Sequence, residues 1–267
     1  MPWTQVSYCY DGSFAGFLTC VFEIYVHREA PAAFSTPTDP RLSLWPERNV
    51  ETDEAHAKRV YASLANKISP AARQLVVRGF LTCLPDREFH LWRFIQYGYT
   101  RGSAVTADLT DSRVLTLYRA VRHLEGEAHL LKGFLRFSEQ EGVLIGEIEP
   151  KNRVLPLLRP HFCTRYAGEA FLIYDRTHRE ALFHRPGDWA IVPLEDFRAA
   201  APGEEERAYR ALWRRFYDTI AIEGRYNPKC RMTHMPKRYW GTMTEFQTDP
   251  PPESGALPRP VRRGPLH

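Results

Sequence analysis

Side chains that can act as acids, bases and anion ligands recur through the middle of this 267-residue chain. Glu125 and His129 are four residues apart in a segment whose apolar residues have helical spacing, so they share one face of the predicted helix. A carboxylate beside an imidazole can orient the ring as a general base. Residues of the same types follow downstream. The catalytic candidates are Glu125, His129, Arg136, His161, Arg165 and Asp175.

The same helix face also has the residue types of a phosphate site. Its polar members, at spacings of four, three and four, are Tyr118, Arg122, Glu125 and His129. An arginine beside a carboxylate and an imidazole can bind an anion, but pairs of opposite charge one turn apart also form ordinary surface salt bridges. Both interpretations stay open.

We expect several of these candidates to meet. The segment Lys132-Gly133 joins the predicted helix directly to a strand that carries Arg136, and consecutive elements are usually neighbours in space. The predicted polar pocket is formed by Glu125, His129, Arg136, His161 and Arg165.

Metal, nucleotide-cofactor and serine-nucleophile motifs are missing from the sequence. The five cysteines lie at least eleven residues apart, and no HExxH pattern occurs, so we expect no metal. No glycine-rich phosphate loop occurs, and we expect no cofactor. Ser13 follows Asp11-Gly12 without the second glycine of a nucleophile elbow and is typical of a helix cap.

The carboxyl-terminal part of the chain is basic and aromatic. Residues 207–267 contain twelve Lys or Arg against five Asp or Glu. Cations hold phosphates while planar rings stack on unpaired bases, so this mixture favours nucleic acid. The alternative is that Tyr239 and Trp240 only pin the terminus to the core. The nucleic-acid candidates are Arg207, Arg210, Arg214, Arg225, Lys229, Arg231, Lys237, Arg238, Tyr239 and Trp240.

Four strings along the chain carry a family resemblance. They are Tyr10-Asp11-Gly12-Ser13-Phe14, Lys132-Gly133-Phe134-Leu135-Arg136-Phe137, His161-Phe162 with Arg165, and Pro236-Lys237-Arg238-Tyr239-Trp240. With them the chain resembles a bacterial family of DNA metabolism proteins, a domain of unknown function found beside a radical SAM protein of DNA modification or repair. Some relatives are fused to a uracil-DNA glycosylase-type domain. The resemblance covers about residues 6–246 and supplies no catalytic residues.

The resemblance implies a role as an accessory or DNA-handling factor in repair or modification. Its implied partners are DNA, single- or double-stranded, a radical SAM protein and a uracil-DNA glycosylase-type protein. An enzyme acting on nucleic acid or a nucleotide-like substrate is the alternative, and a protein-interaction scaffold is a third hypothesis. Geometry distinguishes them, because only the enzyme requires the catalytic candidates in one cleft.

The local patterns predict an α+β fold in which an antiparallel sheet is covered by helices. Gln5–Tyr10 alternates as a strand, and residues 30–50 look like a surface loop with one short strand at 42–44. A last helix at 205–221 has an apolar seam of Tyr209, Trp213, Phe216 and Ile220. The predicted organisation is one domain over residues 1–248, helix-rich at 13–131, with a β-hairpin within 132–200, a terminal helix and basic segment at 205–246, and a disordered proline-rich tail at 249–267.

Composition sets the broad class. With 43% hydrophobic and 25% charged residues, the chain is typical of a soluble globular protein. The longest apolar run, Phe14–Phe22, is far shorter than the roughly 20 residues of a membrane span, so no membrane association is expected. The first residues show no basic leader before an apolar stretch, which predicts a cytoplasmic location.

Overall fold

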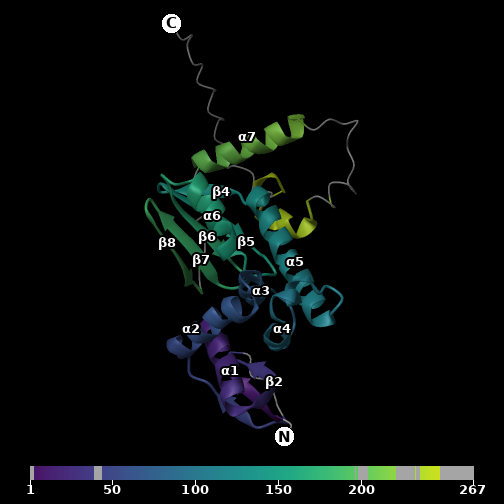
Figure 1. Ribbon diagram of the computed structural model, residues 1–267. Coiled ribbons are helices and arrows are strands. Elements are labelled where there is room, and N and C mark those ends of the chain that lie inside the picture. The colour runs from purple at the N-terminus through teal and green to yellow at the C-terminus, as the bar shows by residue number, and fades with distance from the viewer. Residues whose placement is uncertain are drawn as a thin grey trace, which may run out of the picture. The chain divides into compact units, whose positions relative to one another are not determined.

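The computed structural model describes residues 3–38, 44–195, 197, 204–220, 232 and 235–246. It confirms the α+β class, with helices covering a sheet. The chain forms two compact units, each with its own sheet (Figure 1). Unit 1 is Met1–Ala128 with Lys151–Val154, and unit 2 is His129–Pro150 with Leu155–His267. That residues 1–248 form a single domain stays a prediction, and the predicted tail at 249–267 lies outside the described residues.

Unit 1 contains a three-stranded parallel sheet. Strand β1 (Thr4–Cys9) lies between β2 (Glu29–Ser35) and β3 (Glu47–Asn49). As predicted, β1 leads through a tight turn into helix α1 (Phe14–His27), whose N-cap Ser13 accepts a hydrogen bond from the Gly16 amide at 2.9 Å. The turn therefore belongs to a β-α-β unit, and Ser13 acts as a helix cap.

The prediction of a surface loop at residues 30–50 was wrong for β2 and β3. Strand β2 contains Pro31, which has no amide hydrogen to donate and normally argues against a strand. The proline is tolerated because β2 is an edge strand and its pairing shifts register between Val6 and Ser7, directly opposite. Part of the strand predicted at 42–44 lies outside the described residues.

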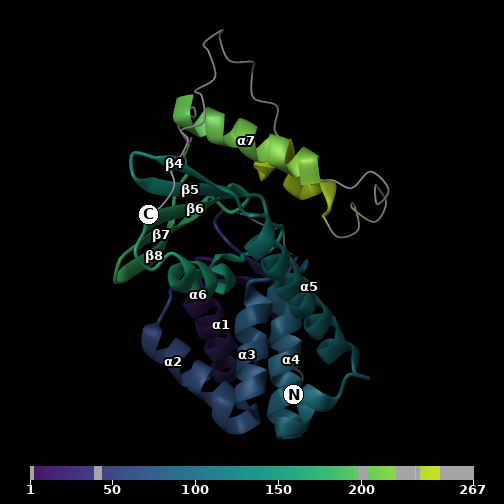
Figure 2. The ribbon, with the colours of Figure 1, turned by 90° about the horizontal axis from the view of Figure 1, so that it is seen from above.

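Two further helices of unit 1 begin at residues whose side chains cap them. Ser69 caps the helix that starts with Pro70, because proline is tolerated in the first turn of a helix. The preceding helix is capped by Asp53, which accepts from the Ala55 and His56 amides, while the hydroxyl of its neighbour Thr52 donates to Asp11. Helices α1 to α4 stand side by side in Figure 2. The bounds are α2 (Glu54–Ser63), η1 (Leu64–Ile68), α3 (Pro70–Phe80), α4 (Arg87–Arg101) and η2 (Gly102–Ala107).

The longest helix is α5 (Ser112–Phe134), which continues from unit 1 into unit 2. Its predicted apolar stripe is confirmed, since every member is at most 6% exposed. The stripe is Val114, Leu117, Val121, Leu124, Ala128 and Leu131. No described helix has the length and apolar character that crossing a membrane requires.

Unit 2 contains a five-stranded sheet in the order β4-β5-β6-β7-β8. The predicted hairpin is confirmed as β4 and β5, joined by a turn with positive φ at Glu141 and Gly142. The prediction that its first strand carries Arg136 was wrong, because α5 continues to Phe134 and β4 begins only at Phe137. The sheet is mixed, because α6 crosses between β5 and β6 and allows these two strands to run parallel. The bounds are β4 (Phe137–Gln140), β5 (Val143–Ile148), α6 (Leu155–Arg165), β6 (Ala170–Asp175), β7 (Glu180–Arg185), β8 (Asp188–Pro193), α7 (Glu204–Ile220), η4 (Lys237–Thr242) and η5 (Thr244–Phe246).

Candidate nucleic-acid interface

A groove of about 940 Å³ lies within unit 2, where α7 passes over the end of α5, the start of β4 and the end of α6. Four cations and one carboxylate line it, together with tyrosine, tryptophan and phenylalanine rings. The charged residues are Lys132, Arg136, Arg165, Arg210 and Glu206. The rings are Phe137, Phe162, Tyr166, Tyr209 and Trp213.

Two of the groove's arginines are fixed by their partners. The Arg136 guanidinium donates to both carboxylate oxygens of Glu245, with the shorter distance, Nη2 to Oε1, at 2.7 Å. Arg210 donates from Nε to Glu206 Oε1 at 2.9 Å and also bonds the Ser138 hydroxyl. These contacts hold both guanidiniums in defined orientations at the groove.

The other two cations, Lys132 and Arg165, form no ion pair within the described part of the chain. The Arg165 guanidinium lies 5.7 Å from the centre of the Tyr166 ring. Because the ring carries no net charge, this contact leaves the charge of Arg165 uncompensated. These two cations therefore contribute a positive potential to the groove, in which Glu206 is the single lining carboxylate among the described residues.

Two aromatic side chains of α7, Tyr209 and Trp213, are exposed at the groove. Tyr209 is 63% exposed and Trp213 is 41% exposed, and both line the groove. The Trp213 ring lies 6.0 Å from the Arg136 guanidinium, and its Nε1 donates to Glu245 at 3.4 Å. Both rings belong to the apolar seam predicted on this helix, and the side chains of its other two members, Phe216 and Ile220, lie outside the description.

His161 is electrostatically coupled to the unpaired cations beside the groove. Burial lowers the pKa of its imidazole, and the charges of Lys132 and Arg165 lower it further. The ring also lies 4.9 Å from the ring of its neighbour Phe162, which lines the groove. His161 therefore lies next to two cations, Lys132 and Arg165, whose charges oppose protonation of its ring.

The described segment at residues 235–246 makes its main contacts through aromatic rings. Tyr239 is only 2% exposed and lies 5.4 Å from the ring of Phe134. Trp240 donates from Nε1 to the Met235 carbonyl at 3.0 Å and stacks on Phe246. The Tyr239 contact matches the alternative that this ring pins the terminus to the core, whereas the Trp240 contacts stay within residues 235–246.

The remaining basic candidates are spread over α7 and this segment. Arg207 is exposed, and Arg214 donates from Nε to the Arg210 carbonyl at 3.3 Å. The Lys237 ammonium lies 5.9 Å from the Trp240 ring, and Arg238 lies over the ring of Tyr239. Three further candidates lie outside the described residues, namely Arg225, Lys229 and Arg231.

The catalytic candidates occupy different places. Glu125 belongs to unit 1, where it forms an ion pair with Arg78, and His129 is exposed at the start of unit 2. Asp175 is fully buried and accepts from the Thr177 and His178 amides, so it braces a turn. The convergence of Glu125 on the residues of unit 2 stays a prediction.

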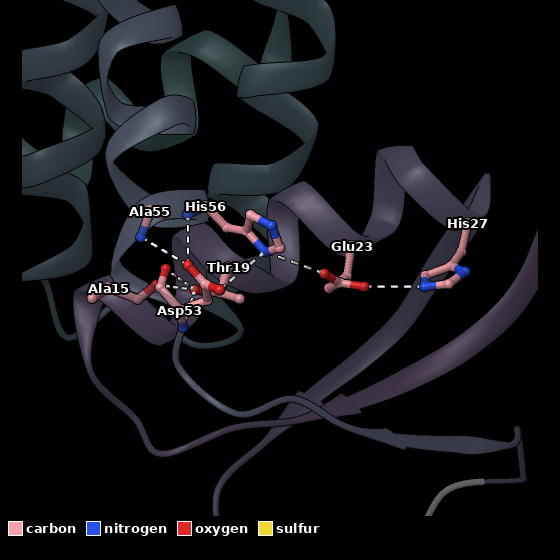
Figure 3. Close-up of polar contacts among 7 residues, drawn as sticks. All are labelled: Ala15, Thr19, Glu23, His27, Asp53, Ala55 and His56. Carbon is pink, nitrogen blue, oxygen red and sulfur yellow. Dashed lines mark hydrogen bonds and ion pairs between the residues drawn. The ribbon is translucent and has the colours of Figure 1, made fainter.

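A polar cluster in unit 1 escaped the sequence analysis (Figure 3). The Glu23 carboxylate on α1 forms a hydrogen bond with His27 Nε2 at 3.0 Å and lies 3.6 Å from His56 Nδ1 on α2. The Thr19 hydroxyl accepts from the Asp53 amide at 3.2 Å. These contacts fasten α1 to the start of α2, and the sequence shows only the spacings within each helix, Glu23–His27 and Asp53–His56. No group of three or more His, Cys, Asp or Glu side chains in the described ranges could hold a metal ion.

One comparison with known families gives a match. A family described as a domain of unknown function, DUF4130, matches residues 85–245, which include all the lining residues of the groove. No curated protein matches the chain. Three of the four strings noted in the sequence meet in unit 2, because Arg136 and Arg165 line the groove and Tyr239 packs on Phe134.

Proposed function

Because this chain belongs to the DUF4130 family, whose function is unknown, we propose a function from the chemistry of its groove: it binds nucleic acid that has unpaired bases. The observation that carries the proposal is that four cations line the same groove as the exposed rings of Tyr209 and Trp213. Such a combination suits a strand whose phosphates and bases are both accessible.

The cations supply the affinity for phosphate. Lys132 and Arg165 have no carboxylate partner within the described residues, so a phosphate can approach them without breaking an existing ion pair. Arg136 and Arg210 are already oriented by Glu245 and Glu206, which lowers the entropy lost on binding.

The rings supply the preference for unpaired bases. A base in a duplex is stacked on its neighbours on both sides, whereas a single-stranded base can stack on Trp213 or Tyr209. Each such stack contributes about 1 to 3 kcal/mol and tolerates any base, because every base has a π face. The groove therefore favours single-stranded segments, loops or ends without reading a fixed sequence.

The biological setting of this binding rests on the resemblance. We place the protein as a DNA-handling factor in repair or modification that acts with a radical SAM protein and a uracil-DNA glycosylase-type protein. The enzymatic alternative stays a prediction. The lining carboxylate Glu206, which a catalytic acid or base would require, forms an ion pair with Arg210.

The test is a fluorescence-anisotropy titration of labelled single-stranded and duplex oligonucleotides of equal length. The single strand should bind more tightly, and Trp213→Ala should weaken its binding by about tenfold, the loss of one stacked base. The duplex should be affected less, because its bases cannot reach the ring.

Trp189→Ala is the matched control. Trp189 on β8 is 47% exposed and lies 4.0 Å from the Arg159 guanidinium, so it reproduces an arginine-tryptophan pair outside the groove. Its removal should leave both affinities unchanged. Equal losses for Trp189→Ala and Trp213→Ala, or equal binding of duplex and single strand, would contradict the proposal.

A further inference from the structure

A second concave site lies within unit 1, between α3 and α5. It has a volume of about 480 Å³, which falls within the usual range for sites that enclose a small molecule. Each helix contributes four residues, which are three, one and three positions apart and therefore lie on one face of that helix. The residues are Ala71, Gln74, Leu75, Arg78, Tyr118, Val121, Arg122 and Glu125.

The packing of the two helices keeps this site open in a fixed shape. Gly79 on α3 lies directly against Leu117 on α5, and a side chain at Gly79 would collide with it. The Arg78 guanidinium bonds the Glu125 carboxylate across the site. Because a close apolar contact and an ion pair both join the helices, the pocket walls do not depend on a ligand.

The charge of the site is unbalanced. Arg78 and Arg122 supply two positive charges, and Glu125 supplies the single negative charge of the lining. Arg122 is exposed and forms no ion pair or hydrogen bond within the described part of the chain. A guanidinium with its donors unused beside a second, oriented guanidinium is the arrangement that recognises a phosphate group.

The rest of the site suits a planar group attached to that phosphate. The Tyr118 ring is 46% exposed, although it lies on the same helix as the buried stripe. Leu75 and Val121 supply an apolar wall, and the Gln74 amide supplies both a donor and an acceptor. A heterocycle can stack on such a ring while its edge hydrogen-bonds an amide.

From these observations we propose that the α3–α5 pocket binds a nucleoside monophosphate. The phosphate lies between Arg122 and Arg78, and the base lies against Tyr118 and the apolar wall. The site differs in its residues from the groove of unit 2, so a free nucleotide and a nucleic-acid strand occupy separate places on this chain.

Calorimetric titration of the full chain with adenosine monophosphate, adenosine and inorganic phosphate tests the proposal. Arg122→Ala should weaken binding of the nucleotide by about tenfold or more, the usual loss for a charge-assisted hydrogen bond. Tyr118→Ala should weaken the nucleotide but not inorganic phosphate. Glu125→Gln should strengthen nucleotide binding, because it removes the negative charge beside the phosphate.

Arg119→Ala is the matched control, since Arg119 is exposed on the same helix but does not line the pocket. It should bind the nucleotide like the wild type. Equal losses for Arg119→Ala and Arg122→Ala, or inorganic phosphate binding as tightly as the nucleotide, would overturn the proposal. It is also overturned if the free nucleotide does not bind while Arg122→Ala weakens an oligonucleotide, because the site would then contact a nucleic-acid backbone.

Discussion

Arg136 and Glu245 are 109 residues apart in sequence, yet the guanidinium of one donates to both carboxylate oxygens of the other. The Glu245 side chain is 1% exposed and that of Arg136 is 27% exposed. The pair thus joins the start of the five-stranded sheet to the 3-10 helix η5 and orients a cation of the groove. Such a contact cannot be inferred from local spacing.

Replacing Glu245 by Ala should destabilise unit 2. Arg136 would lose two charge-assisted hydrogen bonds while remaining partly buried, at a cost of about 2 kcal/mol in the free energy of unfolding. Chemical denaturation measures this loss in the free energy of unfolding. Glu139→Ala on the exposed face of β4 is the control and should stay within about 0.5 kcal/mol of the wild type. Similar stabilities for the two variants would contradict the structural role of the pair.

The turn after β1 depends on a glycine in the first turn of α1. A side chain at Gly16 would meet Asp11 Oδ1 and lie 2.8 Å from the Thr52 hydroxyl, which itself donates to Asp11. Gly16→Ala should therefore cost about 1 to 3 kcal/mol of folding stability.

The same glycine-to-alanine substitution should have the opposite effect on folding stability at Gly126. Gly126 lies within α5 with no atom near the position of an added side chain, so alanine should stabilise the helix by up to about 1 kcal/mol. Thermal unfolding of the two variants should shift in opposite directions. A destabilised Gly126→Ala or an unaffected Gly16→Ala would refute this account of the two sites.

His161 reports on the unpaired cations. Its pKa should lie below the ordinary value of about 6.5, because burial and the charges of Lys132 and Arg165 oppose protonation. The unfolded chain then binds the proton more readily, so this residue's contribution to stability is complete above about pH 6.5 and is lost as the pH falls below it.

Titration of His161 by NMR checks this directly. Arg165→Gln should raise the pKa, and a bound oligonucleotide should raise it as well, because phosphate neutralises the same cations. Arg185→Gln, which alters an exposed cation outside the groove, should leave it unchanged. A pKa at or above 6.5 in the free protein would show that the cations do not act on the ring.

Much of the fold could be predicted because its signals are local. The stripe of α5 follows from apolar spacing, and the caps Ser13 and Ser69 follow from side-chain chemistry at helix starts. Strand β2 was missed because its sequence, with Pro31 and small residues, lacks the alternation of a strand and is stabilised by pairing with β1. Its pairing is a tertiary effect.

The candidate site could be predicted in its residue types but not in its arrangement. The basic and aromatic character of α7 was visible in the sequence. Arg136 and Arg165 were both selected from the sequence, but as catalytic candidates. Lys132 was missed as a site residue, because nothing in its neighbourhood signals that a distant helix completes a groove beside it. Tyr239 was selected for its ring, but burial against Phe134 removes that ring from the surface.

The salt dependence of single-strand binding tests the central claim most directly. Each cation that contacts phosphate contributes about 0.7 to the slope of the logarithm of the association constant against the logarithm of salt concentration. Arg165→Ala and Lys132→Ala should each reduce that slope by about this amount, while Arg185→Ala should leave it unchanged. Slopes that match the wild type in both groove variants, or no binding at about 50 mM salt, would contradict nucleic-acid binding in the groove.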